Sequence, residues 1–224
     1  MTQATDTGRG VVCRAWYAVL ALVIAVAMVI QIVVLVRAGT DVNTATGESG
    51  VGVAVRLARL FSYFTIQSNL LTLVLAISLA LAPARDGRGW RVLHADALLG
   101  IFITGLVFGT VLASQVHHHG IAVWLNAAFH YFAPAWALAG WLLFGPRPRL
   151  DWATLGWLFV WPVLWIVYTF AHGAATGWYP YPFLDVTTHG YAIACRNTGA
   201  VILLALILLA IMRPLDRRLP TVTW

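Results

Sequence analysis

The sequence contains no lysine and few charged residues of any kind. Charged side chains account for 10% of its 224 residues, whereas 61% of the residues are apolar. The mean hydropathy of +0.82 is typical of proteins that cross a bilayer several times. The polar remainder is too short to build a separate soluble core. We therefore expect a single all-α membrane domain that covers residues 1–224.

Cysteines and contiguous basic segments are also scarce. Cys13 and Cys195 lie far apart in the sequence, so neither a disulfide nor a paired-cysteine zinc site is indicated. The fourteen arginines exceed the acidic residues by six, but they are dispersed over loops and form no contiguous basic face. This pattern argues against nucleic acid as a partner and favours the membrane itself.

Long apolar runs, in contrast, are abundant. Six of them are long enough to cross a bilayer as helices, and short segments with glycine, proline or charge separate them. The first run is too long for a cleavable signal core, so we interpret it as an uncleaved span. The expected spans are 15–36, 58–82, 93–115, 121–144, 152–172 and 190–212.

The arginines predict the orientation of these spans. If the N-terminus is cytoplasmic, ten arginines lie in the tails and loops on the inner side and three on the outer side. Positively charged loops remain on the cytoplasmic side. We therefore expect a multi-pass protein of the plasma (inner) membrane with both termini cytoplasmic, including short tails at residues 1–14 and 213–224.

His130 is the most informative single residue, because it lies within the uncharged stretch 121–144. An ionisable side chain inside a membrane span is costly and usually has a functional role. Pro134 follows four residues later and has no N–H to donate to the carbonyl of residue 130. The sequence therefore predicts a distorted helix with an exposed backbone acceptor beside His130.

Polar residues of three spans are expected at one depth. Spans two, four and six run in the same direction, so depth can be counted from their first residues. Thr65, His130 and Arg196 then lie roughly 9–14 Å below the outer surface, at ~1.5 Å per residue. Span two also carries polar residues at helical spacing, namely Ser62, Thr65, Asn69 and Thr72. This layer predicts a cavity in the outer half of the bilayer.

Three segments carry a resemblance to a known family. They are Tyr63–Leu70 (YFTIQSNL), Asn126–Pro134 (NAAFHYFAP) and Trp178–Asp185 (WYPYPFLD). In this order they resemble the bacterial branch of the androgen-induced-protein family of multi-pass membrane proteins. Characterised animal members are intramembrane threonine hydrolases of fatty acid esters of hydroxy fatty acids. The resemblance implies that Thr65 and His130 are the catalytic pair, and Asp185 stands where animal members carry glutamate.

The leading hypothesis is a lipid-ester hydrolase without a cofactor, which takes its substrate from the bilayer. Thr65 would attack the ester carbonyl and His130 would accept the threonine proton. An oxyanion donor is also required, and Gln67, Asn69 and Asn126 are the candidates. Arg196 would hold a substrate carboxylate by a bidentate contact. Alternatively, Arg196 reaches the outer interface or pairs with Asp185.

Two other functions use partly the same residues. A zinc-dependent lipid hydrolase would bind its metal through a carboxylate and three imidazoles, from Asp185, His130, His172 and His189. A carrier or channel would line a path for a proton or a small anion with His130 and Arg196. The sequence indicates no protein partner.

Overall fold

The computed structural model describes residues 2–43 and 50–220, with side chains from Gly8 onward, and within these ranges it is all-α. Six helical segments are long and apolar enough to cross a membrane, which confirms the expected fold class. The elements are α1 (Thr2–Ala38), α2 (Val53–Ser62), α3 (Phe64–Leu81), α4 (Arg88–Val107), the π-helical turn η1 (Phe108–Leu112), α5 (Ile121–Ala127), the π-helical turn η2 (Ala128–Phe132), α6 (Ala133–Phe144), α7 (Trp152–Leu158), α8 (Val160–Thr176), the 3-10 turn η3 (Pro182–Leu184) and α9 (Val186–Arg218).

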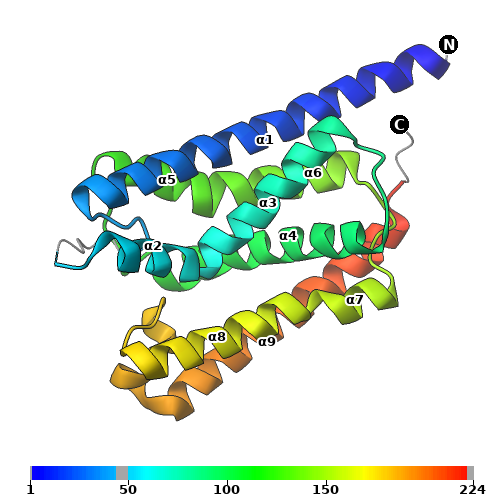
Figure 1. The fold of residues 1–224 in the computed structure, drawn as a ribbon. Coiled ribbons are helices and arrows are strands. Elements are labelled where there is room, and N and C mark those ends of the chain that lie inside the picture. Colours follow the sequence, from blue (N-terminus) through cyan, green and yellow to red (C-terminus); the bar gives the residue numbers. More distant parts are fainter. Residues whose placement is uncertain (1, 44–49, 221–224) are drawn as a thin grey trace.

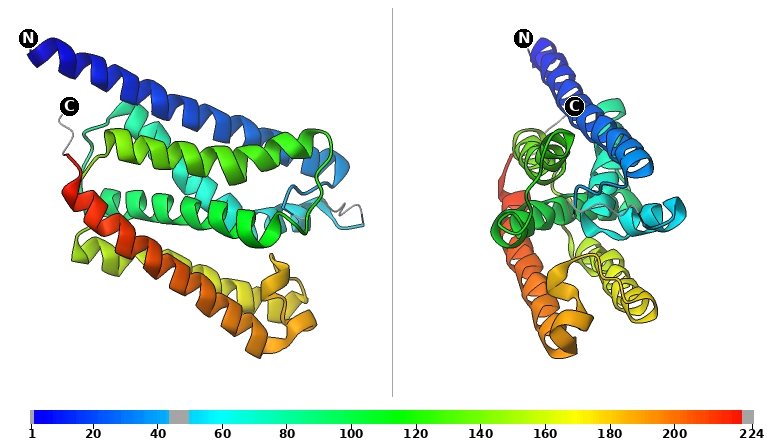
Figure 2. Two further views of the ribbon diagram at one scale, coloured as in Figure 1. Left: turned by 180° about the vertical axis from the view of Figure 1, so that it is seen from behind. Right: turned by 90° about the vertical axis from the view of Figure 1, so that its left-hand side faces the viewer.

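The helices form two groups (Figures 1 and 2). The bundle consists of α1, α3, α4 and the nearly continuous helix α5–η2–α6. The arm consists of α8, the segment 177–185 and α9, which diverge from the bundle. The two groups differ in burial when the most apolar stretch of each span is compared. In the span that contains α4, 67% of these residues are buried, whereas in α9 only 17% are buried. The arm therefore presents most of its surface outward.

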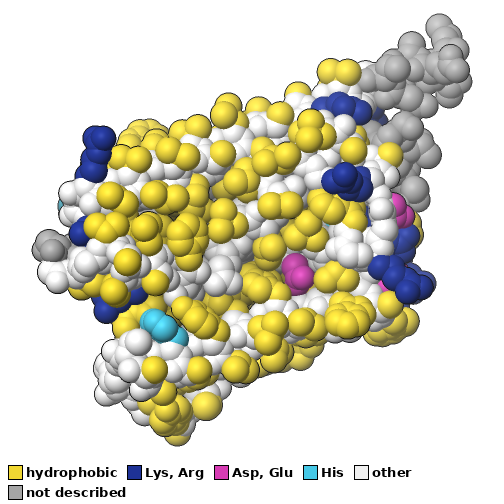
Figure 3. All heavy atoms as spheres, in the orientation of Figure 1, with side chains coloured by type: hydrophobic (Ala, Val, Ile, Leu, Met, Phe, Trp, Pro, Cys, Tyr) yellow, Lys and Arg dark blue, Asp and Glu magenta, His cyan; other side chains and the backbone are white. Residues whose placement is uncertain are grey.

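The outer surface suits a hydrocarbon environment. Figure 3 shows apolar side chains over the middle of the molecule, with arginines gathered at its two ends. Both ends of the described chain lie at one of these ends (Figure 1), called the terminal end below. This arrangement agrees with an even number of spans. The side of the membrane that the terminal end faces stays a prediction.

Close packing holds the bundle together. Trp16 of α1 and Trp136 of α6 stack at 4.0 Å, and each indole N–H donates to the backbone carbonyl of the other residue. Gly105 of α4 lies where an added Cβ would come within 2.9 Å of Pro134. Small residues at such contacts allow membrane helices to approach closely.

The arm is attached to the bundle at the terminal end. The Asp216 carboxylate of α9 accepts hydrogen bonds from the backbone N–H groups of Arg149 and Leu150, at 2.7 and 2.9 Å. Asp86, in the loop before α4, pairs with Arg149 and with Arg91. These contacts join two loops, the start of α4 and the end of α9 at the terminal end.

The expected spans and the observed helices differ in continuity at span two. The fourth observed segment, Ile121–Phe144, has the predicted bounds, and α9 is interrupted at Gly190, where the predicted sixth span begins. The predicted second span, 58–82, is wrong at its start because Tyr63 adopts an extended conformation (φ −68°, ψ 131°) and separates α2 from α3. Ser62 therefore lies on α2, outside the polar stripe of α3.

The helix distortion expected near His130 is present in a different form. Residues Ala128–Phe132 form a π-helical turn directly before α6, and Pro134 lies in the first turn of α6. A second π-helical turn, Phe108–Leu112, continues α4. π-Helical turns are rare and frequently occur at functional sites. Here the two of them lie around the candidate site.

Candidate functional site

Thr65 and His130 lie together inside the bundle. Thr65 is in the first turn of α3, and its Oγ1 is 3.4 Å from Nε2 of His130 in η2. Both side chains are buried, with exposed fractions of 3% and 2%. The structure thus brings together two residues that are 65 positions apart in sequence. We call them the Thr65–His130 pair.

The His130 ring is fixed mainly by packing. It stacks on Phe108 of η1, with ring centroids 3.9 Å apart. Its Nδ1 makes no hydrogen bond to any described residue. Because Nε2 faces Thr65, the tautomer with the proton on Nδ1 leaves Nε2 free to accept the threonine proton.

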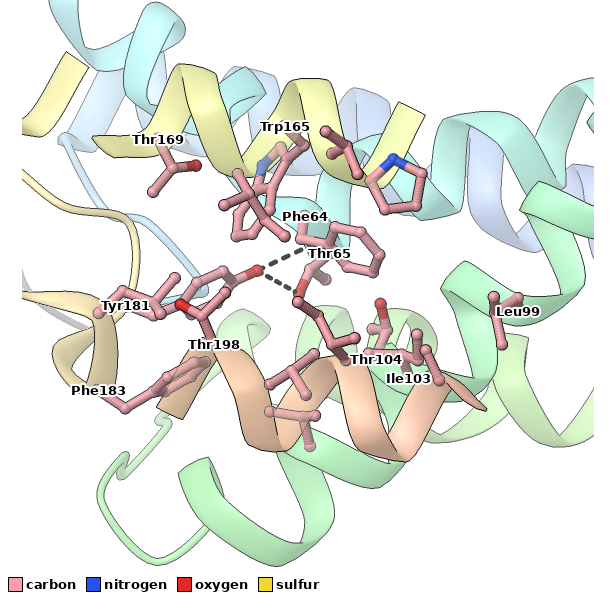
Figure 4. Close-up of a pocket in the computed structure, with 18 of the residues that line it drawn as sticks. Phe64, Thr65, Leu99, Ile103, Thr104, Trp165, Thr169, Tyr181, Phe183 and Thr198 are labelled. Atoms are coloured by element: carbon pink, nitrogen blue, oxygen red, sulfur yellow. Dashed lines mark hydrogen bonds between the residues drawn. The ribbon is translucent and has the colours of Figure 1, made fainter. Parts of the chain in front are cut away.

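Tyr181 is a third member of the site. Its hydroxyl oxygen lies 3.0 Å from the backbone nitrogen of Thr65 and 3.1 Å from Thr65 Oγ1 (Figure 4). The ring is buried between Tyr63 and Phe183, at centroid distances of 5.5 and 5.4 Å. Burial raises the pKa of the Tyr181 phenol to about 12, against the opposing effect of its hydrogen bonds with Thr65. The phenol therefore keeps its proton at neutral pH.

Sequence reasoning assigned no role to Tyr181. The residue falls within the segment 178–185 that carries the family resemblance, between two prolines. That placement was the available signal, but a loop has no periodicity from which its contacts can be deduced.

Asn69 connects the two halves of the pair. Its Nδ2 donates to the carbonyl of Thr65 at 2.8 Å and to the carbonyl of Phe129 at 3.4 Å. The Ser68 hydroxyl also donates to the Thr65 carbonyl, at 3.1 Å. Asn69 therefore supports the backbone on both sides of the pair, and its amide protons are already in use.

The two other oxyanion candidates point elsewhere. Gln67 donates to the carbonyl of Phe61 and accepts from the indole N–H of Trp161. Asn126 is buried, and its Oδ1 has no hydrogen-bond partner among the described residues. Neither side chain has a hydrogen bond with Thr65 within the part of the chain that the structure describes.

Arg196 and Asp185 lie outside the pair. Arg196 is exposed on α9, and its guanidinium has one long contact, 3.5 Å, with Asn197. Asp185 caps the start of α9 by accepting hydrogen bonds from Thr187 and Thr188. Partial burial tends to raise the Asp185 pKa, but these hydrogen bonds outweigh that effect and lower it. Among the described residues, Arg196 and Asp185 form no ion pair with each other.

A cavity of about 150 Å³ lies between the bundle and the arm, with Thr65 on its wall. Its lining comes from α3, α4, η1, α8, η3 and α9, and most of it is apolar. The described residues of the lining include no charged side chain. The hydroxyl groups in the lining (Figure 4) belong to Thr65, Thr104, Thr169, Tyr181 and Thr198. The Thr169 hydroxyl is buried and has no hydrogen-bond partner among the described residues. His130 lies behind Thr65 and does not line the cavity.

The residue sets of the alternative functions are not assembled. Among the described residues, no group of three or more His, Cys, Asp or Glu side chains could hold a metal ion, so the proposed zinc ligands do not converge. His172 packs instead against Tyr168 and Trp178. His130 and Arg196, the two residues expected along a transport path, are both absent from the cavity lining.

Comparison with known proteins finds no match: no family model fits the sequence, and no curated protein or solved structure is similar to it.

Proposed function

We propose that the protein is a membrane-embedded hydrolase of lipid esters, with Thr65 as the nucleophile and His130 as the general base. The observation that carries this proposal is the 3.4 Å separation of Oγ1 and Nε2 at the wall of an apolar cavity. A threonine hydroxyl is a weak nucleophile until a neighbouring base accepts its proton. The separation exceeds the ~2.6–3.2 Å of a tight catalytic hydrogen bond, and such contacts commonly shorten when substrate binds.

The reaction would proceed in two halves. Thr65 Oγ1 forms a bond to the ester carbonyl carbon while its proton passes to His130 Nε2. The tetrahedral intermediate then expels the alcohol, which takes the proton from Nε2 and leaves an acyl-threonine. In the second half, His130 removes a proton from water, and the resulting hydroxide displaces the acyl group as a free acid. The proton on Nε2 returns to Thr65 Oγ1.

The cavity favours an uncharged acyl chain. A largely apolar cavity of about 150 Å³ accepts a ligand with about six carbon atoms, so a longer chain extends beyond it. No charged side chain in the lining is available for a carboxylate. If the substrates are fatty acid esters of hydroxy fatty acids, as the resemblance implies, their free carboxylate lies outside this cavity.

The proposal includes the family relationship and the location. The three motifs and the Thr65–His130 pair support membership of the androgen-induced-protein family. The arginine distribution supports a bacterial inner membrane with both termini inside. In that orientation α3 begins in the outer half of the bilayer, since it starts toward the end opposite the termini (Figure 1).

The test is covalent labelling of the purified protein with a fluorophosphonate, together with hydrolysis of a lipid ester. We expect labelling and hydrolysis that persist with a chelator and disappear in Thr65→Ala. Thr72→Ala is the matched control, because the Thr72 hydroxyl is also buried in α3 and bonds to the Ser68 carbonyl at 2.8 Å. Hydrolysis that survives in Thr65→Ala, or that a chelator abolishes, would overturn the proposal.

A further inference from the structure

The hydrogen bonds around Tyr181 have one consistent direction. The backbone N–H of Thr65 can only donate, so the phenol oxygen accepts at that contact, which is 3.0 Å long. The phenol proton is then directed to Thr65 Oγ1, at 3.1 Å. The proton of the threonine hydroxyl remains for His130 Nε2. The geometry thus forms a chain from the α3 backbone through Tyr181 and Thr65 to His130.

The phenol oxygen also occupies a position that suits a negative charge. It lies at the N-terminus of α3, an 18-residue helix, where free N–H groups and the helix dipole attract anions. In acyl transfer, the carbonyl oxygen of the substrate becomes negatively charged beside the nucleophile and requires such donors.

We propose that Tyr181 is a third catalytic group, whose hydroxyl donates a hydrogen bond to the ester carbonyl oxygen as that oxygen becomes the oxyanion. The inference rests on the proposed function. When the substrate enters, the Tyr181 hydrogen bond moves from Thr65 Oγ1 to the carbonyl oxygen. The phenol keeps its proton, and the proton of Thr65 passes to His130. When the intermediate collapses, the hydrogen bond returns to its first acceptor.

The cavity and the neighbouring amides favour this role for Tyr181. Tyr181 lines the cavity beside Thr65, so its hydroxyl faces the space that the ester would occupy (Figure 4). The amide protons of Asn69 bind backbone carbonyls, and Gln67 is engaged with Phe61 and Trp161. Tyr181 thus has a hydroxyl proton to donate, a contact with Thr65 Oγ1 and a position on the cavity wall. Asn69 and Gln67 lack this combination.

The first experiment compares Tyr181→Phe with Tyr168→Phe. Each change removes one phenol oxygen, and Tyr168 bonds to Ser62 at 2.7 Å away from the cavity. We expect Tyr181→Phe to lower kcat about 100-fold or more, as for other oxyanion donors, with little change in KM. Tyr168→Phe should keep the native rate. Native kcat in Tyr181→Phe would overturn the inference, and the proposed function would stand if Thr65→Ala were inactive. Native activity in Thr65→Ala would overturn both.

A second experiment separates catalysis from packing. A trifluoromethyl ketone forms a tetrahedral adduct with an oxyanion, whereas the ether analogue of the ester does not. Tyr181→Phe should weaken inhibition by the ketone as strongly as it lowers kcat/KM and leave ether binding unchanged. Equal weakening of both, with a lower melting temperature, would identify Tyr181 as structural and overturn the inference.

A third experiment retains the tyrosine ring in case the phenylalanine variant folds poorly. Fluorinated tyrosines at position 181 keep the ring and lower the pKa of its phenol. Because the donor must be protonated, activity should then be lost at lower alkaline pH than in the native protein, whose phenol has a pKa of about 12. An alkaline limb that does not move would overturn the inference.

Discussion

The bundle and the arm contribute differently to the same site. The bundle supplies Thr65 and His130 from α3 and η2, which are covered by neighbouring helices and joined by Asn69. The arm supplies Tyr181 and much of the cavity wall, and its helices leave most of their surface uncovered. The Thr65–His130 pair thus lies in the densely packed part of the molecule, whereas much of the cavity wall belongs to the loosely packed part.

This division suggests why a membrane hydrolase would be built in two parts. A nucleophile and its base must stay within hydrogen-bond reach, which dense packing secures. Under the proposed function a lipid enters sideways from the bilayer, and a sparsely covered pair of helices would obstruct that entry less. If the comparison is right, changes in the bundle should affect activity and stability together, whereas changes in the arm should affect activity alone.

The largest effect is expected at the base itself. His130→Gln keeps a hydrogen-bonding group but cannot accept a proton at neutral pH. We expect hydrolysis to fall by about 10²- to 10⁴-fold, the usual contribution of a general base. The matched control is His94→Gln, because His94 is an equally buried histidine of α4 outside the cavity. Initial rates with a lipid ester test this prediction. Full activity in His130→Gln would show that His130 is not the general base.

A pair of glycine substitutions compares the two regions directly. Gly105→Ala places a Cβ 2.9 Å from Pro134 and 3.3 Å from the His130 carbonyl. Overpacking of this kind costs about 1–3 kcal/mol, so both melting temperature and activity should fall. Gly173→Ala places a Cβ against the ring of Tyr179, two residues before Tyr181.

For Gly173→Ala we expect kcat to fall about 10- to 100-fold, because a displacement of ~1 Å at Tyr181 is enough for such a loss. The melting temperature should change less than in Gly105→Ala. Initial rates and melting curves of the two variants test this prediction. A larger loss of stability in Gly173→Ala than in Gly105→Ala would show that the arm is packed as firmly as the bundle.

A smaller effect is expected at the base of the arm. The hydrogen bond from Arg91, together with Arg149, lowers the Asp86 pKa well below its usual value. A lowered folded pKa means that the ionised carboxylate stabilises the fold above about pH 3.9, the unfolded value, and that this contribution is lost as the pH falls toward the folded pKa. Melting temperatures in detergent at pH 6 and pH 3 should differ more for the native protein than for Asp86→Asn. An identical acid response in the two proteins would contradict this account.

The sequence predicted the bundle better than the arm, and the reason is physical. The spans follow from apolar length, and helical counting brought Thr65 and His130 to one depth before any contact was known. The break at Tyr63 was missed because it involves neither glycine nor proline. Tyr181 was missed because the contacts of a loop depend on how the elements pack around it.

The same limit applies to Arg196, because the depth counted along span six does not specify which face of the helix the residue occupies. Thr198, Val201 and Ala205 of α9 line the cavity. Arg196 precedes Thr198 by two residues, which corresponds to a rotation of about 200° around the helix. The exposed guanidinium therefore faces away from the cavity, and its role as a carboxylate anchor stays a prediction that the fold does not favour.

The smallest effect is accordingly expected for Arg196→Gln. The native protein and the variant should be compared on a lipid ester with a free carboxylate and on its methyl-capped analogue. Because the guanidinium is exposed and the cavity lining carries no charge, we expect the ratio of kcat/KM for the two esters to be the same in both proteins. A preference for the free acid that disappears in the variant would mean that α9 turns Arg196 toward the substrate. The arm would then bind the substrate carboxylate as well as form part of the cavity wall.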